Sequence, residues 1–243
     1  MVENKTVRNS IVFLMVFFSI IGSDNLCASV VMSGTRIIYS SPLKAKTVQL
    51  SNRDDQPYIV QLQVARSDGQ NITDDASAYF TLLPQIFRME PGAGQSVRLI
   101  YSGETLPQDR ETLFYLSFSQ LPALKAQEKH TNQLIFAITN RIKIFFRPAG
   151  LSGTPDNIAE KLSFNLKEGN IEVSNPGGYY VVVRHAALVI KGRPVTLAKA
   201  MMISPKSTAI WQPSARINTL KGACLRLTLV NDYGSDVTTD RCL

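Results

Sequence analysis

The chain has 243 residues, of which 44% are hydrophobic and 19% are charged, and this composition excludes an intrinsically disordered protein. Its formal net charge is +7 and its isoelectric point is near 9.4, which favours an anionic partner such as a nucleic acid, a membrane surface or a peptide carboxylate. Because the charges are spread along the sequence rather than gathered in one arm, nucleic acid is the weakest of these three.

Residues 1–28 have the features of a secretory signal peptide. Lys5 and Arg8 precede an apolar run at 11–21, and a plausible cleavage site follows Ala28. The run is shorter than the roughly 20 apolar residues that a transmembrane helix needs. We therefore expect an exported protein that does not insert into a membrane once the signal is removed.

The rest of the sequence predicts short β-strands. The alternation of apolar and polar side chains is clearest at Val60, Leu62 and Val64, which share one face of a strand. Similar alternating or β-branched runs occur, in chain order, at 46–52, 58–65, 95–101, 162–166, 171–173, 179–190 and 224–230. No strongly amphipathic helical pattern follows the signal, so the fold class expected is all-β, built of β-sandwiches.

A segment rich in proline and glycine, 147–157, follows the densest strand run. It predicts two domains, at 29–148 and 158–243, joined by a linker at 149–157. Each is near the size of an immunoglobulin-like sandwich of about 100 residues.

Removal of the signal leaves two cysteines, Cys224 and Cys242. The turn-like residues 231–236 lie midway between them, so a hairpin about this turn places the two cysteines opposite each other. The same register places Arg226 opposite Asp240. Export permits a disulfide, and two free thiols are the alternative.

The sequence lacks the patterns of common catalytic and cofactor sites. His130 and His185 have no zinc-ligand spacing with the cysteines, so no metal site is expected. No glycine-rich phosphate loop opens a helix. Residues 41–44 match the S-x-x-K pattern of some hydrolases, but Pro42 and the strand-like surroundings argue against the helix that this pattern needs. We expect no cofactor, no catalytic residues and no enzyme activity.

The stretch LPQDRETLFYLSFSQLPA, at 106–123, is hard to explain as ordinary sandwich strand. Five other distinctive segments occur before and after it. In chain order they are GTR at 34–36, RMEPGAGQSVRL at 88–99, RIKIFFRPA at 141–149, SNPGGYYV at 174–181 and NDYG at 231–234. Together they resemble the signature of the periplasmic pilus chaperones, the PapD-like family. The matches run from just after the signal almost to the C-terminus.

The resemblance implies two immunoglobulin-like β-sandwich domains set as a boomerang, with a cleft between them. It also implies a periplasmic protein whose partners are pilus (fimbrial) subunits and an outer-membrane usher. In this family the chaperone lends a strand to a subunit that lacks its own last strand, which covers an exposed edge and an open core.

The resemblance also assigns roles to individual residues. Arg36 and Lys143 match the two cations that hold the C-terminal carboxylate of the subunit. Leu134, Phe136 and Ile138 match the side chains of the donated strand that fill the groove of the subunit. The alternatives are that the two cations are solvated strand residues and that the three apolar residues face the core of their own domain.

The neighbouring residues refine this expectation. Ile135 and Ala137, of the opposite parity, are also apolar, which predicts a strand covered by its own domain on one face and by a guest on the other. The preceding loop, 122–132, is of modest length and has no cysteine, which resembles the branch of the family that serves rod-like pili.

Three further charges, Glu111, Arg147 and Asp232, match an ion network that sets the angle between the two domains of these chaperones. The alternative is three unrelated surface charges. For the whole protein, the alternative function is a secreted immunoglobulin-like adhesin or a structural pilus component. The sequence leaves open which subunits are bound and whether the free protein self-associates.

Overall fold

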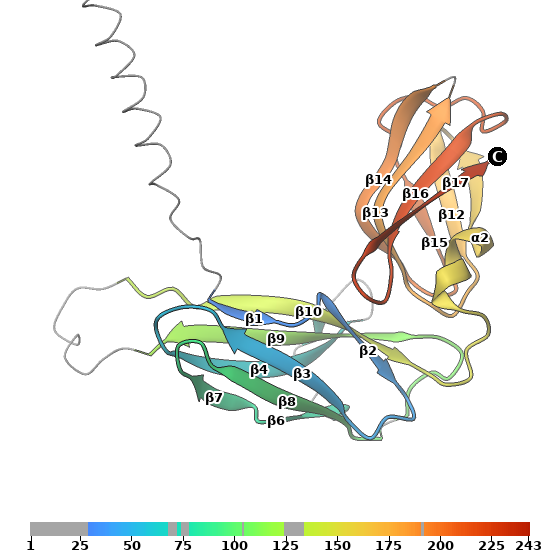
Figure 1. Ribbon diagram of the computed structural model, residues 1–243. Helices are drawn as coiled ribbons and strands as arrows, with labels where there is room; N and C mark the ends of the chain where they lie inside the picture. Colours follow the sequence, from blue (N-terminus) through green and yellow to red (C-terminus); the bar gives the residue numbers. More distant parts are fainter. Residues whose placement is uncertain (1–28, 68–71, 74–77, 104, 124–133, 191) are drawn as a thin grey trace, which may run out of the picture.

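The computed structural model describes residues 29–67, 72–73, 78–103, 105–123, 134–190 and 192–243 (Figure 1). The signal peptide expected at 1–28 lies outside this part of the chain, as does most of the loop at 122–132. Among the described residues, no helix is both long and apolar enough to cross a membrane. Helix is confined there to two short elements, η2 (Pro155–Asn157) and α2 (Ile158–Lys161).

The first half of the chain forms a sandwich of two sheets, called here the first sandwich. One sheet has the order β1-β3-β8-β6, made of Val30–Met32, Lys46–Asn52, Gly94–Tyr101 and Phe80–Leu83. The other has the order β2-β10-β9-β4-β5, with β7 also paired to β4, made of Arg36–Ser40, Ile138–Arg147, Thr112–Pro122, Tyr58–Ser67, Ile72–Thr73 and Ile86–Met89.

Alternating side chains build the core of the first sandwich, as the sequence predicts. Val60, Leu62 and Val64 are buried, whereas the intervening glutamines of β4 are exposed. Aromatic rings close the end of the core nearest the linker: Tyr39 stacks on Phe146 at 6.0 Å. This close packing of rings holds strands β2 and β10 firmly against the core.

The second half forms another sandwich, called here the second sandwich. Its three-stranded sheet has the order β11-β12-β15, made of Ser163–Lys167, Asn170–Asn175 and Ser207–Trp211. Its four-stranded sheet has the order β14-β13-β16-β17, made of Arg193–Ile203, Val181–Ile190, Cys224–Val230 and Asp236–Cys242. The core between the sheets surrounds Trp211, which is 1% exposed.

The C-terminal hairpin confirms the predicted register. Cys224 pairs with Cys242 across β16 and β17 and the two form a disulfide. Arg226 donates two hydrogen bonds of 2.8 Å to the carboxylate of Asp240. Because β17 is an edge strand with few buried side chains, the disulfide fixes the end of the hairpin that the core cannot hold.

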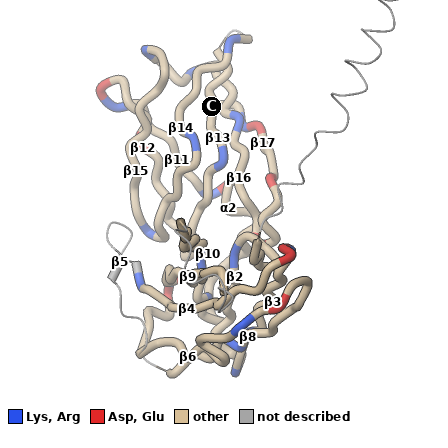
Figure 2. The backbone as a smooth tube through the Cα atoms, turned by 90° about the vertical axis from the view of Figure 1, so that its left-hand side faces the viewer, with Lys and Arg blue, Asp and Glu red and all other residues tan. Residues whose placement is uncertain are grey.

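The two sandwiches meet at an angle, so the molecule has the shape of an L (Figure 1). Seen from the side, strands β2, β9 and β10 lie on the part of the first sandwich nearest the second (Figure 2). The all-β class and the two-sandwich arrangement expected from the sequence are confirmed. The junction between the sandwiches therefore gathers β2, β10 and the β16–β17 turn.

Candidate functional site

One edge of strand β10 is open for part of its length. Strand β9 pairs with β10 in an antiparallel ladder over 138–146. On the other side, β2 pairs with β10 in parallel only from Lys143, which faces Arg36, to Arg147, which faces Ser40. No other described strand pairs with β10 between Ile138 and Ile142. Unpaired backbone groups of this kind are a template for the addition of another strand.

Large apolar side chains are exposed at the start of this open edge and in the residues just before it. Leu134, Phe136 and Ile138 are 80%, 67% and 50% exposed. By strand alternation, Ile138 has the parity of Ile142 and Ile144, which pack against and within the core of the first sandwich. The three exposed residues thus continue a core-facing line beyond the end of the sandwich.

The prediction that this segment is covered on one face by its own domain is wrong for the free protein. Ile135 is 44% exposed, and Ala137 is exposed as well. The physical reason is that pairing with β9 begins only at Ile138, opposite Gln120. Among the described strands, none of the same sheet pairs with the residues before Ile138 to hold them against the core.

Arg36 and Lys143 lie side by side where the open edge ends. Within the described residues, neither forms a salt bridge with a carboxylate. Arg36 donates one hydrogen bond of 3.1 Å, from Nη1 to the carbonyl of Val230, while its buried Nε has no partner in the described structure. The guanidinium also lies 5.8 Å from the centre of the Phe145 ring.

Both cations are held at a cost in electrostatic energy. Burial lowers the pKa of Lys143, and the positive charge of Arg36 lowers it further. Burial also lowers the pKa of Arg36, although the negative charge of Asp232 opposes this. Two half-buried like charges disfavour each other. An anion placed between the two cations would favour their charged forms and raise both pKa values.

The three charges expected to form an interdomain network lie in contact. Arg147 donates to Glu111 from Nε at 2.7 Å, and to both carboxylate oxygens of Asp232 at 2.6 and 2.8 Å. The backbone N–H of Tyr180 donates to Glu111 at 2.8 Å. Arg147 and Glu111 belong to the first sandwich, whereas Asp232 and Tyr180 belong to the second. The network therefore joins the two sandwiches.

The network is partly buried, and burial shifts the pKa values of its members. The carboxylate of Glu111 is nearly inaccessible, so burial raises its pKa, against the opposing effects of Arg147 and the Tyr180 N–H. Burial disfavours the charge on Arg147, but the hydrogen bonds and charges of Asp232 and Glu111 outweigh it and raise its pKa above the ordinary value. The interaction holds Arg147 charged.

Sequence reasoning missed a second set of contacts between the sandwiches. Lys206 Nζ donates to the carboxylate of Asp109, and the N–H of Glu111 donates to the carbonyl of Gly178 at 2.7 Å. A Cβ atom on Gly178 would lie 3.0 Å from the carbonyl oxygen of Asp109. The pair Gly177–Gly178 in the segment SNPGGYY was the available signal, since close backbone approach requires glycine.

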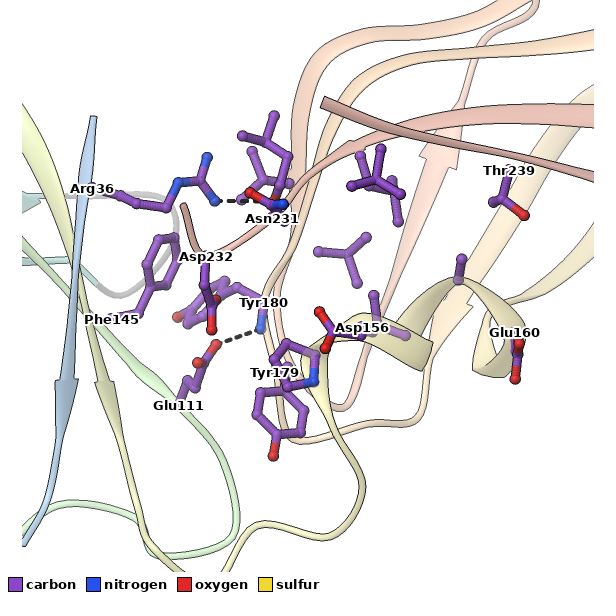
Figure 3. A pocket seen from close by; sticks show the side chains of 18 of the residues that line it. Arg36, Glu111, Phe145, Asp156, Glu160, Tyr179, Tyr180, Asn231, Asp232 and Thr239 are labelled. Atoms are coloured by element: carbon purple, nitrogen blue, oxygen red, sulfur yellow. Dashed lines mark hydrogen bonds between the residues drawn. The ribbon is translucent and has the colours of Figure 1, made fainter. Parts of the chain in front are cut away.

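A cavity of about 330 Å³ opens between the sandwiches, beside the network. Figure 3 shows Arg36 and Phe145 at one end, Glu160 and Thr239 at the other, and Asp156 between them. Its walls come from β10, from the segment 179–182, from η2 and α2, and from the β16–β17 hairpin. No sequence pattern predicts this cavity, because its walls come from separate segments.

Two family models together match most of the chain between residues 29 and 241. The model described as "Pili and flagellar-assembly chaperone, PapD N-terminal domain" matches residues 29–152. The model described as "Pili assembly chaperone PapD, C-terminal domain" matches residues 157–241. The two matches follow the order of the two sandwiches.

Relatives and solved structures agree with the family models. The chaperone protein MrkB of Klebsiella pneumoniae is 33% identical over 212 residues, which are 86% of this chain and 89% of MrkB. The chaperone protein HifB of Haemophilus influenzae is 32% identical over 235 residues, which are 93% of this chain and 95% of HifB. The crystal structure of the YadV chaperone matches with a TM-score of 0.76 and 29% identity, covering 89% of this chain and 100% of that one.

These relatives are named as chaperones and match over most of their length, which favours the chaperone over the adhesin as the function of this chain. The matched regions include both sandwiches and the junction between them. The protein therefore belongs to the PapD-like family of pilus assembly chaperones.

Proposed function

We propose that this chaperone binds pilus subunits by adding the open edge of β10 to an incomplete subunit sandwich, without catalysis. The observation that carries the proposal is the coincidence of three features on strand β10 and the residues just before it. These are an unpaired backbone edge, exposed apolar side chains along it, and two cations without a carboxylate partner among the described residues at its end.

The direction of the guest strand follows from where the edge is closed. A strand lying beside 134–142 cannot continue past Lys143, because β2 occupies that edge from Arg36 onward. A chain that ends there presents its terminal carboxylate to Arg36 and Lys143. Its C-terminus then lies beside the later residues of β10, so the guest strand runs parallel to β10.

The side chains of the donated segment then fill the guest. Leu134, Phe136 and Ile138 are large, apolar and spaced by two, so they project on one side of an extended segment. Each contributes up to about 1.5–3 kcal/mol when it becomes fully buried. Arg36 and Lys143, called here the carboxylate clamp, fix the register of the guest strand. A slip by two residues would leave the same apolar side chains on the same face but would move the carboxylate away from the two cations.

A relative supports the kind of partner. The SafB chaperone of Salmonella enterica has been solved in complex with the SafA pilin, and it matches this chain with a TM-score of 0.71 and 25% identity, covering 88% of this chain and 96% of that one. We extend the proposal to action in the periplasm and delivery of the subunit to an outer-membrane usher. The expected signal at 1–28 supports the compartment.

Co-purification from the periplasm tests the clamp. The chain is expressed with the subunits encoded beside it, as wild type and as Arg36→Ala, Lys143→Ala and the control Lys167→Ala, an exposed lysine of β11. We expect the wild type and the control to retain soluble subunit and the two clamp variants to lose it. Folded clamp variants that retain as much subunit as the wild type would refute the proposal.

A further inference from the structure

The cavity between the sandwiches begins where the guest strand would end. Alternate residues of a strand share a face, so Lys143, Phe145 and Arg147 point to the same side of β10. Phe145 and Arg147 line the cavity, and so does Arg36, the partner of Lys143 in the parallel ladder. A chain that terminates at the two cations therefore has the cavity directly ahead of it.

The walls of the cavity define the chemistry that it accepts. Near Arg36, the ring of Phe145 packs against that of Tyr180 at 5.6 Å. Val181 and Leu229 of the second sandwich continue this apolar lining. A volume of about 330 Å³ lies at the small end of the range for ligand pockets, about 300–1,000 Å³. It accommodates one large side chain better than a folded segment.

The charges of the cavity are asymmetric. Arg147 is paired with Glu111 and Asp232, which leaves Arg36 as the cation available to a guest. Asp156 and Glu160 also line the cavity, and neither has a salt-bridge partner among the described residues. A carboxylate is therefore favoured at the Arg36 end and disfavoured further in, where Asp156 lies (Figure 3).

We propose that this cavity receives the side chain of the last residue of the subunit, and that it prefers a bulky apolar side chain over a small or an acidic one. The inference rests on the proposed function, since the terminal carboxylate must first be held by Arg36 and Lys143. In this arrangement the second sandwich contacts the last side chain of the subunit directly, through Val181, Leu229 and Val237 of the cavity wall.

Labelled peptides test this preference on the full-length protein. Three synthetic peptides of equal length carry alternating apolar residues and differ only in the last residue, which is Phe, Gly or Glu. Fluorescence anisotropy measures their dissociation constants. We expect the dissociation constant of the Phe-ended peptide to be lower than that of the Gly-ended one by a factor of about ten or more. The Glu-ended peptide should bind most weakly.

Two matched substitutions locate the effect. Val237 is 51% exposed and lines the cavity, whereas Ile210 is 63% exposed on β15 and does not. Val237→Trp fills the cavity and should abolish the advantage of the Phe-ended peptide. Ile210→Trp adds the same bulk elsewhere on the second sandwich and should preserve it.

A third variant separates failure of this inference from failure of the proposed function. Lys143→Ala should weaken all three peptides by a similar factor. Equal affinities for the three peptides, with the Lys143 effect intact, would overturn the terminal side-chain site and leave the clamp standing. Peptides that do not bind, or that bind regardless of Lys143, would overturn the clamp and the side-chain site together.

Discussion

At the scale of single residues, the site depends on which charges have partners. Arg147 pairs with two carboxylates, whereas Lys143, four residues earlier in the same strand, has no carboxylate partner among the described residues and lies beside the like charge of Arg36. The segment RIKIFFRP contains both residues, and the family resemblance assigns them different roles. Their different electrostatic environments arise from β2 and the β16–β17 turn, which the segment itself does not encode.

Subunit binding should weaken at alkaline pH. Burial and Arg36 lower the pKa of free Lys143 from 10.5, and a bound carboxylate raises it again. Binding then takes up a proton at any pH between the two values, so affinity is greatest below the lowered pKa and falls as the pH rises through it, by up to about ten-fold per pH unit. Titration of the Phe-ended peptide between about pH 7 and pH 10 measures this.

Lys143→Arg is the control for this pH dependence. An arginine keeps its charge throughout this range, so the variant should bind with little change over the same interval. If the wild type shows the flat profile of the variant, Lys143 does not change its protonation on binding.

At the scale of elements, alternation predicts the strands that bury one face and misses those held by their neighbours. Strands β3, β4, β8 and β16 were predicted because their apolar residues recur every second position. Strand β14, Arg193–Ile203, was not, since polar residues interrupt its pattern. Its structure comes from pairing with β13, in which the register shifts between Ala186 and Ala187 and leaves Leu197 of β14 as the extra residue. The strand pattern also does not predict the length of the open edge of β10, because that length depends on where β2 starts.

The donated segment should be needed for binding but not for folding. Phe136→Ser removes a side chain that is 67% exposed in the free protein, so the stability of the chaperone should change by no more than about 0.5 kcal/mol. Co-purified subunit should fall sharply. The control is Ile86→Ser, at a residue that is 60% exposed on β7. Equal amounts of subunit with both variants would contradict the assigned role of the segment.

The disulfide should stabilise the second sandwich locally. It closes a loop with a sequence separation of 18, for which the expected contribution is about 3 kcal/mol. Trp211, the chain's one tryptophan, lies in the core of this sandwich, so its fluorescence during urea unfolding reports on this sandwich. The double substitution Cys224→Ala and Cys242→Ala should lower the free energy of unfolding by about that amount.

The reduced wild type provides the comparison for the disulfide. Its unfolding curve, measured with a reductant present, should coincide with that of the double variant. Coincidence of the oxidised wild type with the double variant would show that the hairpin is held by its ladder and by packing alone.

At the scale of the whole molecule, the angle between the sandwiches depends on contacts that neither sandwich makes alone. The pattern of strands predicts two sandwiches, and the family resemblance selects Glu111, Arg147 and Asp232 as the residues between them. The contacts of Gly178 and of Asp109 with Lys206 were not predicted, because they arise only when two distant loops approach. The ion network and these further contacts together restrict rotation more than either set does alone.

Arg147→Met should loosen this angle while both sandwiches stay folded. It leaves the carboxylate of Glu111 buried without its cation and facing Asp232. Loss of one partner from a buried pair typically costs about 3–5 kcal/mol, and separation of the sandwiches is the simplest relief. Small-angle X-ray scattering should show a larger radius of gyration, and Trp211 fluorescence should show an intact second sandwich.

Arg88→Met is the matched control for the angle. Arg88 also pairs with a carboxylate, that of Glu90, but both side chains are exposed and belong to the first sandwich. Its loss should leave the scattering profile unchanged. If the two variants scatter alike, the ion network does not set the angle.

The start of β2 has one more consequence. Because this strand closes the edge of β10 from Lys143 onward, the proposed mode of binding makes it a fixed stop for a guest chain. Subunits of different sequence would then be aligned from their last residue backward, whatever their length. An affinity tag appended to the C-terminus of a subunit would meet the stop before the carboxylate reached the cations, whereas a tag at the N-terminus would leave the alignment untouched.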